Sequence, residues 1–93
     1  MAIRPVVKVE AAPGKREELR MSFASLCAEV REEPGCNQFE AYQNIDDPDR
    51  FILLERWADQ ETFTVHGNLH EKQWLKMIDE LMASSPEAEE YTD

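Results

Sequence analysis

The sequence contains few of the residues that form disulfides or nucleotide-binding loops. Its two cysteines, Cys27 and Cys36, form no CxxC pair, which excludes a disulfide-rich secreted scaffold and predicts reduced thiols. Its three glycines stand alone in the chain, so there is no GxGxxG fingerprint and no P-loop. The sequence therefore predicts that the protein uses no flavin, nicotinamide or nucleotide cofactor.

Long apolar runs and positive charge are also scarce. No run approaches the roughly 20 apolar residues that a membrane span needs, and the N-terminal MAIRPVVKVE has no apolar signal segment after its first charge. Ten basic against 20 acidic side chains give a formal charge of −10, which repels nucleic-acid phosphates and anionic lipid. We therefore expect a cytoplasmic protein that binds neither nucleic acid nor a membrane.

The 93 residues have room for one domain, residues 1–93. Branched residues between Ile3 and Glu10 predict a first strand, in which Pro5 belongs at the strand start or at a sheet edge. From Lys15, apolar residues recur at i, i+4, i+7, i+8 and i+11, which predicts an amphipathic helix that ends at the EEPG turn. These positions are Leu19, Phe23, Leu26, Cys27 and Val30.

Two alternating segments, Cys36–Ile45 and Phe51–Trp57, flank the polar turn DDPDR and predict an antiparallel hairpin. The first segment carries its apolar residues, Ile45 included, on one face. The second segment is apolar on both faces, so we expect a second molecule to cover one of them. Glu55 shares a face with Trp57, and its charge needs either a partner or a wet cavity.

The C-terminal half is predicted to contain two helices. Asp59 is the expected N-cap of a short helix that runs to about His66, and Gly67 and Asn68 are expected to break it before a further helix begins. The last residues, 87–93, form either a short edge strand or a loose tail. This order of elements predicts an α+β, ferredoxin-like split βαβ fold with an antiparallel sheet.

Several segments in colinear order resemble the antibiotic biosynthesis monooxygenase family, over about residues 3–83. They are APGKREEL, EEPGCNQFEAY, DDPDRFILLERWADQETFTVH and HEKQWL. The resemblance implies a homodimer whose open sheet faces form a shared α/β barrel, with a pocket between sheet and helices in each protomer. It also implies a small hydrophobic or aromatic substrate that reacts with molecular oxygen. The family contains different activities on one fold, so the reaction must be argued from the site.

At two positions the chain departs from the family pattern, and these departures reduce the number of family activities that we expect for it. Haem-degrading members carry an asparagine on the first strand where this chain has Val7, and anthrone oxygenases carry one where this chain has Leu53. These departures argue against both reactions for this chain.

The resemblance also suggests site residues. His66 matches the family's histidine on the helix after the ErW strand, and we predict that it is the catalytic base that takes a phenolic proton; a structural helix-end histidine is the alternative. Trp57 matches the tryptophan that lines the pocket in oxygenase members, and Phe23 is expected beside it, with core packing as the alternative role of Trp57.

Three polar residues complete the predicted site. Glu55 is either a substrate-site residue or part of a structural ion pair. Tyr42 and Gln38, on the mixed face of their strand, offer a hydroxyl and an amide to a polar ligand. His66 and His70 are the only histidines, and because the expected helix break separates them we predict no metal site and no cofactor.

The sequence thus predicts a homodimeric monooxygenase of an electron-rich aromatic, quinol or enol, working without flavin or nicotinamide, so the electrons must come from the substrate. Two alternatives remain open: a non-catalytic dimeric module that binds small molecules, and an enol isomerase or lyase.

Overall fold

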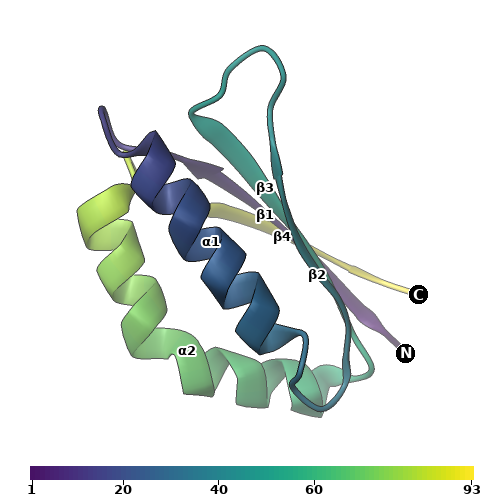
Figure 1. Cartoon of the computed structure of the whole chain (residues 1–93). Helices are drawn as coiled ribbons and strands as arrows, with labels where there is room; N and C mark the ends of the chain where they lie inside the picture. Colours follow the sequence, from purple (N-terminus) through teal and green to yellow (C-terminus); the bar gives the residue numbers. More distant parts are fainter.

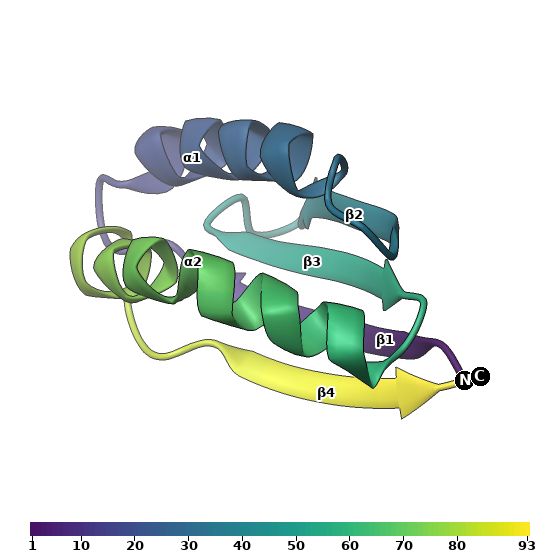
Figure 2. The ribbon, with the colours of Figure 1, turned by 90° about the horizontal axis from the view of Figure 1, so that it is seen from below.

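The computed structural model describes all residues, 1–93, and contains six elements. They are β1 (Ile3–Glu10), α1 (Arg16–Val30), β2 (Cys36–Gln43), β3 (Arg50–Trp57), α2 (Gln60–Leu81) and β4 (Glu87–Thr92). The strands form one antiparallel sheet in the order β2-β3-β1-β4. Both helices lie on one face of this sheet and leave the other face bare (Figures 1 and 2). The predicted α+β, ferredoxin-like fold is confirmed.

The core fills the space between the two helices and the inner face of the sheet. Sixteen apolar side chains are buried there, and they include all five positions predicted for the inner face of α1. In β1 the residues Ile3, Val7 and Val9 point into this core, whereas Val6 lies on the other face and is half-buried. The periodicity of the sequence therefore placed the core-facing sides of α1 and β1 correctly.

β1 is a central strand, paired with β3 on one side and β4 on the other. Pro5 lies near its start, and the register of β1 against β3 passes from Ile3 to Val6 without pairing the two residues between them. Pro5 is aligned with Glu90 of β4, and since it has no N–H to donate, it is tolerated near the strand start where no residue of β3 pairs with it. The last residues of the chain, left open between strand and tail, form β4.

β2 and β3 form the predicted hairpin, with Phe39 opposite Glu55 and Tyr42 opposite Ile52. The prediction was wrong for Ile45, which is 98% exposed in the turn. The strand ends early because Asn44 Oδ1 accepts hydrogen bonds of 2.8 Å from the backbone N–H groups of Asp46 and Asp47. This Asx turn uses the backbone that a longer strand would pair.

The predicted break at Gly67 and Asn68 is wrong, because α2 is one continuous helix. Asp59 is its N-cap, as expected, and accepts a 2.9 Å hydrogen bond from the Thr62 backbone N–H. A single glycine costs a helix about 1 kcal/mol relative to alanine. Burial of the apolar stripe of α2 stabilises the helix by more than this, since side chains such as Met77 and Leu81 are buried along its second half.

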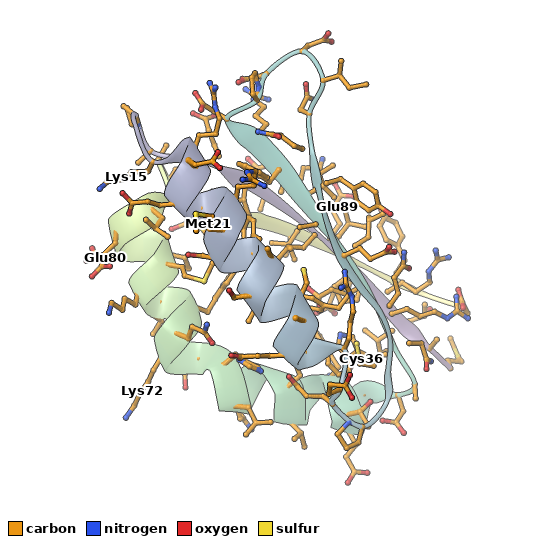
Figure 3. All side chains as sticks on the ribbon, in the orientation of Figure 1. Lys15, Met21, Cys36, Lys72, Glu80 and Glu89 are labelled. Carbon is orange, nitrogen blue, oxygen red and sulfur yellow. The ribbon has the colours of Figure 1, made fainter.

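The outer surfaces of the helices are polar or weakly apolar. Figure 3 shows Met21 on the outside of α1 and Lys72 and Glu80 pointing away from α2. Neither helix has the length and hydropathy that a membrane crossing requires.

Candidate active site

A cavity of about 560 Å³ lies between α2 and the inner face of the sheet, within the range typical of small-molecule sites. Its wall is mostly apolar and draws on both helices and on the sheet. Apolar lining residues include Leu26, Phe39, Leu53, Phe63, Trp74 and Met77. Glu55, His66 and His70 also line the cavity, so it combines an apolar wall with a few titratable groups.

Glu33 bridges the two histidines. Its Oε1 lies 3.1 Å from His66 Nδ1 and its Oε2 lies 2.6 Å from His70 Nε2. All three side chains are largely buried, with 13%, 12% and 17% exposure for Glu33, His66 and His70. Glu33 itself does not line the cavity, so it holds the imidazoles from behind the wall.

The geometry follows from α2 and from the turn that precedes β2. Because α2 is continuous, His66 and His70 are one helical turn apart on the same face, and their ring centroids lie 5.0 Å apart. Glu33 lies in the EEPG turn, where Gly35 adopts φ +81°. A Cβ at Gly35 would lie 2.5 Å from Thr62 Cγ2, so glycine permits the turn to pack on the first turn of α2. That packing brings Glu33 to the histidines.

The partners of each ring nitrogen define the protonation of the histidines. A carboxylate only accepts hydrogen bonds, so His66 Nδ1 donates to Glu33 and the lone pair of a neutral His66 is on Nε2. Burial lowers the pKa of His66, and Glu33 opposes this effect only in part. His66 is therefore neutral at physiological pH, in the tautomer that can accept a proton at Nε2.

His70 is held differently. Its Nε2 faces Glu33 Oε2, and its Nδ1 faces Gln73 Oε1 at 3.2 Å. Burial alone would lower the pKa of His70, but the hydrogen bonds to Glu33 and Gln73 raise it overall. Both ring nitrogens thus face acceptors, which is the physical reason for the raised pKa of His70.

Trp57 supports His66 from the core. The two rings stack with centroids 4.5 Å apart and an interplanar angle of 29°, and Phe39 meets His66 edge-on at 5.4 Å. Trp57 has no exposed surface and does not line the cavity. Its indole therefore packs in the core against His66, and it forms no part of the cavity wall in this structure.

Glu55 lies under the cavity, 6% exposed. Its Oε1 accepts a 2.9 Å hydrogen bond from Trp57 Nε1, and no ion pair within the chain involves it. Burial raises the pKa of Glu55 to about 7, and the hydrogen bond from Trp57 only partly opposes this. No buried side-chain oxygen in the structure lacks a hydrogen bond, so the unpaired Oε2 keeps access to solvent or cavity space.

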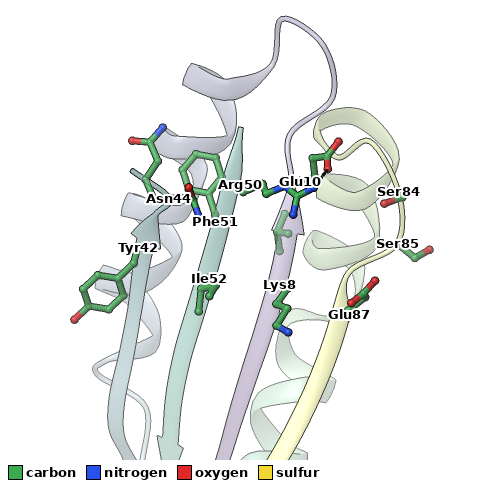
Figure 4. Close-up of a pocket in the computed structure, with 12 residues that line it drawn as sticks. Lys8, Glu10, Tyr42, Asn44, Arg50, Phe51, Ile52, Ser84, Ser85 and Glu87 are labelled. Atoms are coloured by element: carbon green, nitrogen blue, oxygen red, sulfur yellow. Dashed lines mark ion pairs between the residues drawn. The ribbon is translucent and has the colours of Figure 1, made fainter. Parts of the chain in front are cut away.

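The structure brings together only part of the predicted site. His66 and Glu55 meet at the cavity, whereas Phe23 is 1% exposed and packs on Phe51 and Trp74 in the core. Tyr42 lies on the opposite face of the sheet, 51% exposed. It lines a separate, polar hollow of about 430 Å³ near the hairpin, where Arg50 and Glu10 form an ion pair (Figure 4). Gln38 bonds Glu40 on that same strand.

Sequence reasoning missed Glu33 and the pairing of the histidines. A signal was present, because Phe63, His66, His70, Trp74, Met77 and Leu81 continue one helical stripe at spacings of three and four. This stripe runs through Gly67 and indicates a single helix. Nothing in the local sequence, however, connects Glu33 with residues 33 and 37 positions further along.

Comparisons with known proteins agree with this architecture. The family model described as Antibiotic biosynthesis monooxygenase matches residues 2–73, a range that includes Glu33, Glu55, His66 and His70. Among curated proteins, "Putative monooxygenase YcnE" of Bacillus subtilis (strain 168) is 29% identical over 59 residues. That alignment covers 63% of this chain and 62% of the relative, less than two thirds of its length.

Solved structures share the whole fold. A conserved protein from Methanosarcina mazei Go1 superposes with a TM-score of 0.90 at 29% identity, covering 100% of this chain and 93% of that one. PA3566 from Pseudomonas aeruginosa gives a TM-score of 0.89 at 25% identity, covering 99% and 93%. A "Putative antibiotic biosynthesis monooxygenase" from Nitrosomonas europaea gives 0.90 at 22% identity, covering 99% and 89%, a likeness that shows the fold alone.

Proposed function

This chain belongs to the antibiotic biosynthesis monooxygenase family, and on that premise we propose that it is a monooxygenase of a small electron-rich phenol, quinol or enol. The observation that carries the proposal is the Glu33–His66 pair at the wall of an apolar cavity. A carboxylate that holds Nδ1–H orients the imidazole, so that Nε2 can act as general base.

The reaction draws its electrons from the substrate. His66 takes the proton of the phenolic or enolic hydroxyl, and the resulting anion transfers electrons to molecular oxygen. One oxygen atom forms a bond to a substrate carbon. The O–O bond then breaks, and the second oxygen leaves as water with the two hydrogens that the substrate loses. For a phenol the balance is phenol plus O₂ to quinone plus water.

Two other features support this chemistry. The apolar wall excludes water and suits a flat aromatic substrate, because few polar groups compete with its burial. Glu55 lines the same cavity, and a carboxyl with a pKa of about 7 carries a proton for part of the time at neutral pH. In that form it can donate a hydrogen bond to a substrate oxygen.

The test begins with a thermal-shift screen of phenols, quinols and anthrones. A ligand at a hundredfold excess over its Kd stabilises the folded state by about 2.7 kcal/mol. Each hit is then assayed for oxygen uptake. We expect His66→Ala to lower kcat/KM roughly 10² to 10⁴-fold, the usual share of general base catalysis.

Tyr42→Phe is the matched control, since Tyr42 lies on the opposite face of the sheet and its removal should leave oxygen uptake unchanged. Hits without any oxygen uptake would favour the non-catalytic binding module, and turnover without oxygen would favour the isomerase or lyase. Full activity of His66→Ala would contradict the assignment of the base.

A further inference from the structure

We propose that Glu33, His66 and His70 form a binding site for one divalent first-row transition metal ion of the Zn²⁺ type. One atom from each, His66 Nδ1, His70 Nε2 and a Glu33 carboxylate oxygen, can serve as ligand. The candidate ligand atoms all lie within 4.8 Å of one another. The set of two imidazoles and one carboxylate is the ligand set of many catalytic zinc sites and of non-haem iron oxygenases.

The distances are close to those that coordination requires. Metal–ligand bonds of about 2.0–2.1 Å in a tetrahedral site place ligand atoms about 3.3 Å apart. The two carboxylate–imidazole separations are already 3.1 and 2.6 Å. The two contacts use different oxygens of Glu33, so coordination has to open the 2.6 Å contact and bring the other ligand atoms, all within 4.8 Å of one another, closer together. Rotation of side chains on neighbouring helical turns provides that movement.

The position of Gln73 next to His70 independently supports a metal site. Histidines that bind metals almost always donate their second ring N–H to a neighbouring acceptor, which fixes the ring and the tautomer. Gln73 Oε1 lies 3.2 Å from His70 Nδ1, so it holds the proton there and leaves Nε2 for a metal. In the structure a proton on Nε2 bridges to Glu33 instead, in the place that a metal ion would take.

The surroundings suit a cation that enters from solution. Glu33, His66 and His70 keep 13%, 12% and 17% of their side-chain surface exposed, so the cluster is not sealed from solvent. The formal charge of −10 attracts cations to the molecule in general. Imidazole ligands, however, select transition metals over Mg²⁺ and Ca²⁺, which prefer oxygen.

Metal binding has a consequence for catalysis, and this consequence rests on the proposed function. When Nδ1 of a neutral His66 binds the metal, the single proton of the ring moves from Nδ1 to Nε2. With the proton on Nε2 the ring no longer accepts one from substrate. We therefore expect bound Zn²⁺ to inhibit oxygen uptake.

The experiment is isothermal titration calorimetry of Zn²⁺ into the full chain, without substrate, with Co²⁺ as a visible spectroscopic probe. We expect one Zn²⁺ per chain and intense Co²⁺ bands typical of a low-coordinate site. His70→Ala and Glu33→Gln should weaken binding at least 100-fold. Gln73→Leu, which removes only the support of His70, should weaken it about 10 to 100-fold.

Glu32→Gln is the matched control, because it removes the same charge from an exposed neighbour of Glu33, and it should bind Zn²⁺ like wild type. In wild type, long-range nitrogen NMR spectra should show Zn²⁺ shifting His66 Nδ1 and His70 Nε2, which tests the ligands without any variant. Zinc binding that is no tighter than Mg²⁺ binding, or imidazoles that do not respond, would overturn the site. A chain that binds zinc but consumes no oxygen would contradict the proposed function alone.

Discussion

At the scale of single residues, Glu55 gives the clearest link between burial and pH. Its unfolded pKa is near 4.5, and its folded pKa is about 7, so the folded state binds more protons between these values. The contribution of Glu55 to the free energy of unfolding is therefore largest below about pH 4.5 and is lost as pH rises through 7. Wild type should therefore lose on the order of 2–3 kcal/mol of unfolding free energy between pH 5 and pH 8 because of Glu55. We expect Glu55→Gln to abolish this loss. Guanidinium unfolding of both proteins at pH 5 and pH 8 measures it.

The exposed Glu80→Gln makes the same change of charge on the outside of α2 (Figure 3) and serves as control. It should keep the pH dependence of wild type. The ion pair that the sequence leaves open for Glu55 predicts instead that Glu55→Gln lowers the stability of the protein. A difference between Glu55→Gln and wild type that is equal at pH 5 and pH 8 would contradict a buried carboxyl that titrates near neutrality.

At the scale of elements, the packing of the EEPG turn on α2 decides where Glu33 lies. Gly35 and Gly14 both have positive φ, +81° and +77°, but only Gly35 has atoms in the space of a Cβ. We expect Gly14→Ala to lose about 1–2 kcal/mol from the left-handed conformation alone. Gly35→Ala should lose this and about 1–3 kcal/mol more, since the added methyl overlaps Thr62. Chemical denaturation measures both.

Gly35→Ala should also lower oxygen uptake and zinc affinity, because a turn that moves away from Thr62 carries Glu33 away from the imidazoles. Gly14→Ala should leave both properties intact, since Gly14 lies in the loop between β1 and α1, outside the cavity lining. Equal losses of stability in the two variants would mean that the turn can adjust without cost at Thr62.

At the scale of the whole molecule, the bare face of the sheet predicts association. Val6, Ile52 and Leu54 are half-buried there, next to the exposed Tyr42, and this face has no helix over it (Figure 2). We expect a homodimer through this face, with a mass twice the 10.8 kDa of one chain in light scattering. Leu54→Asp should shift it towards monomer, because a stable interface excludes charge from its centre.

Met21→Asp is the matched control for this variant. Met21 is a large apolar side chain, 61% exposed on the outside of α1, and replacing it by Asp should leave the dimer intact. A well-folded monomer of wild type at micromolar concentration would remove the basis for the shared barrel.

Local patterns in the sequence were sufficient for most of the elements. The apolar spacing of α1, the polar turn between β2 and β3, and Asp59 before α2 each depend on neighbours within a few residues, and each prediction is confirmed. The errors at Gly67 and Ile45 came from single residues. At Gly67 the continuing apolar stripe of α2 outweighs the helix-breaking tendency of one glycine, and before Ile45 an Asx turn at Asn44 ends the strand.

The sequence by itself determined the fold class and the family, because these follow from periodicity and from ordered motifs. Only the tertiary structure decided which groups meet at the site. The register of β2 on β3 pairs Tyr42 with Ile52, and this pairing puts Tyr42 on the face away from the cavity. Glu33 reaches His66 and His70 only because a turn packs on a helix more than thirty residues later. Contacts between such distant segments are set by packing, which no local pattern of residues encodes.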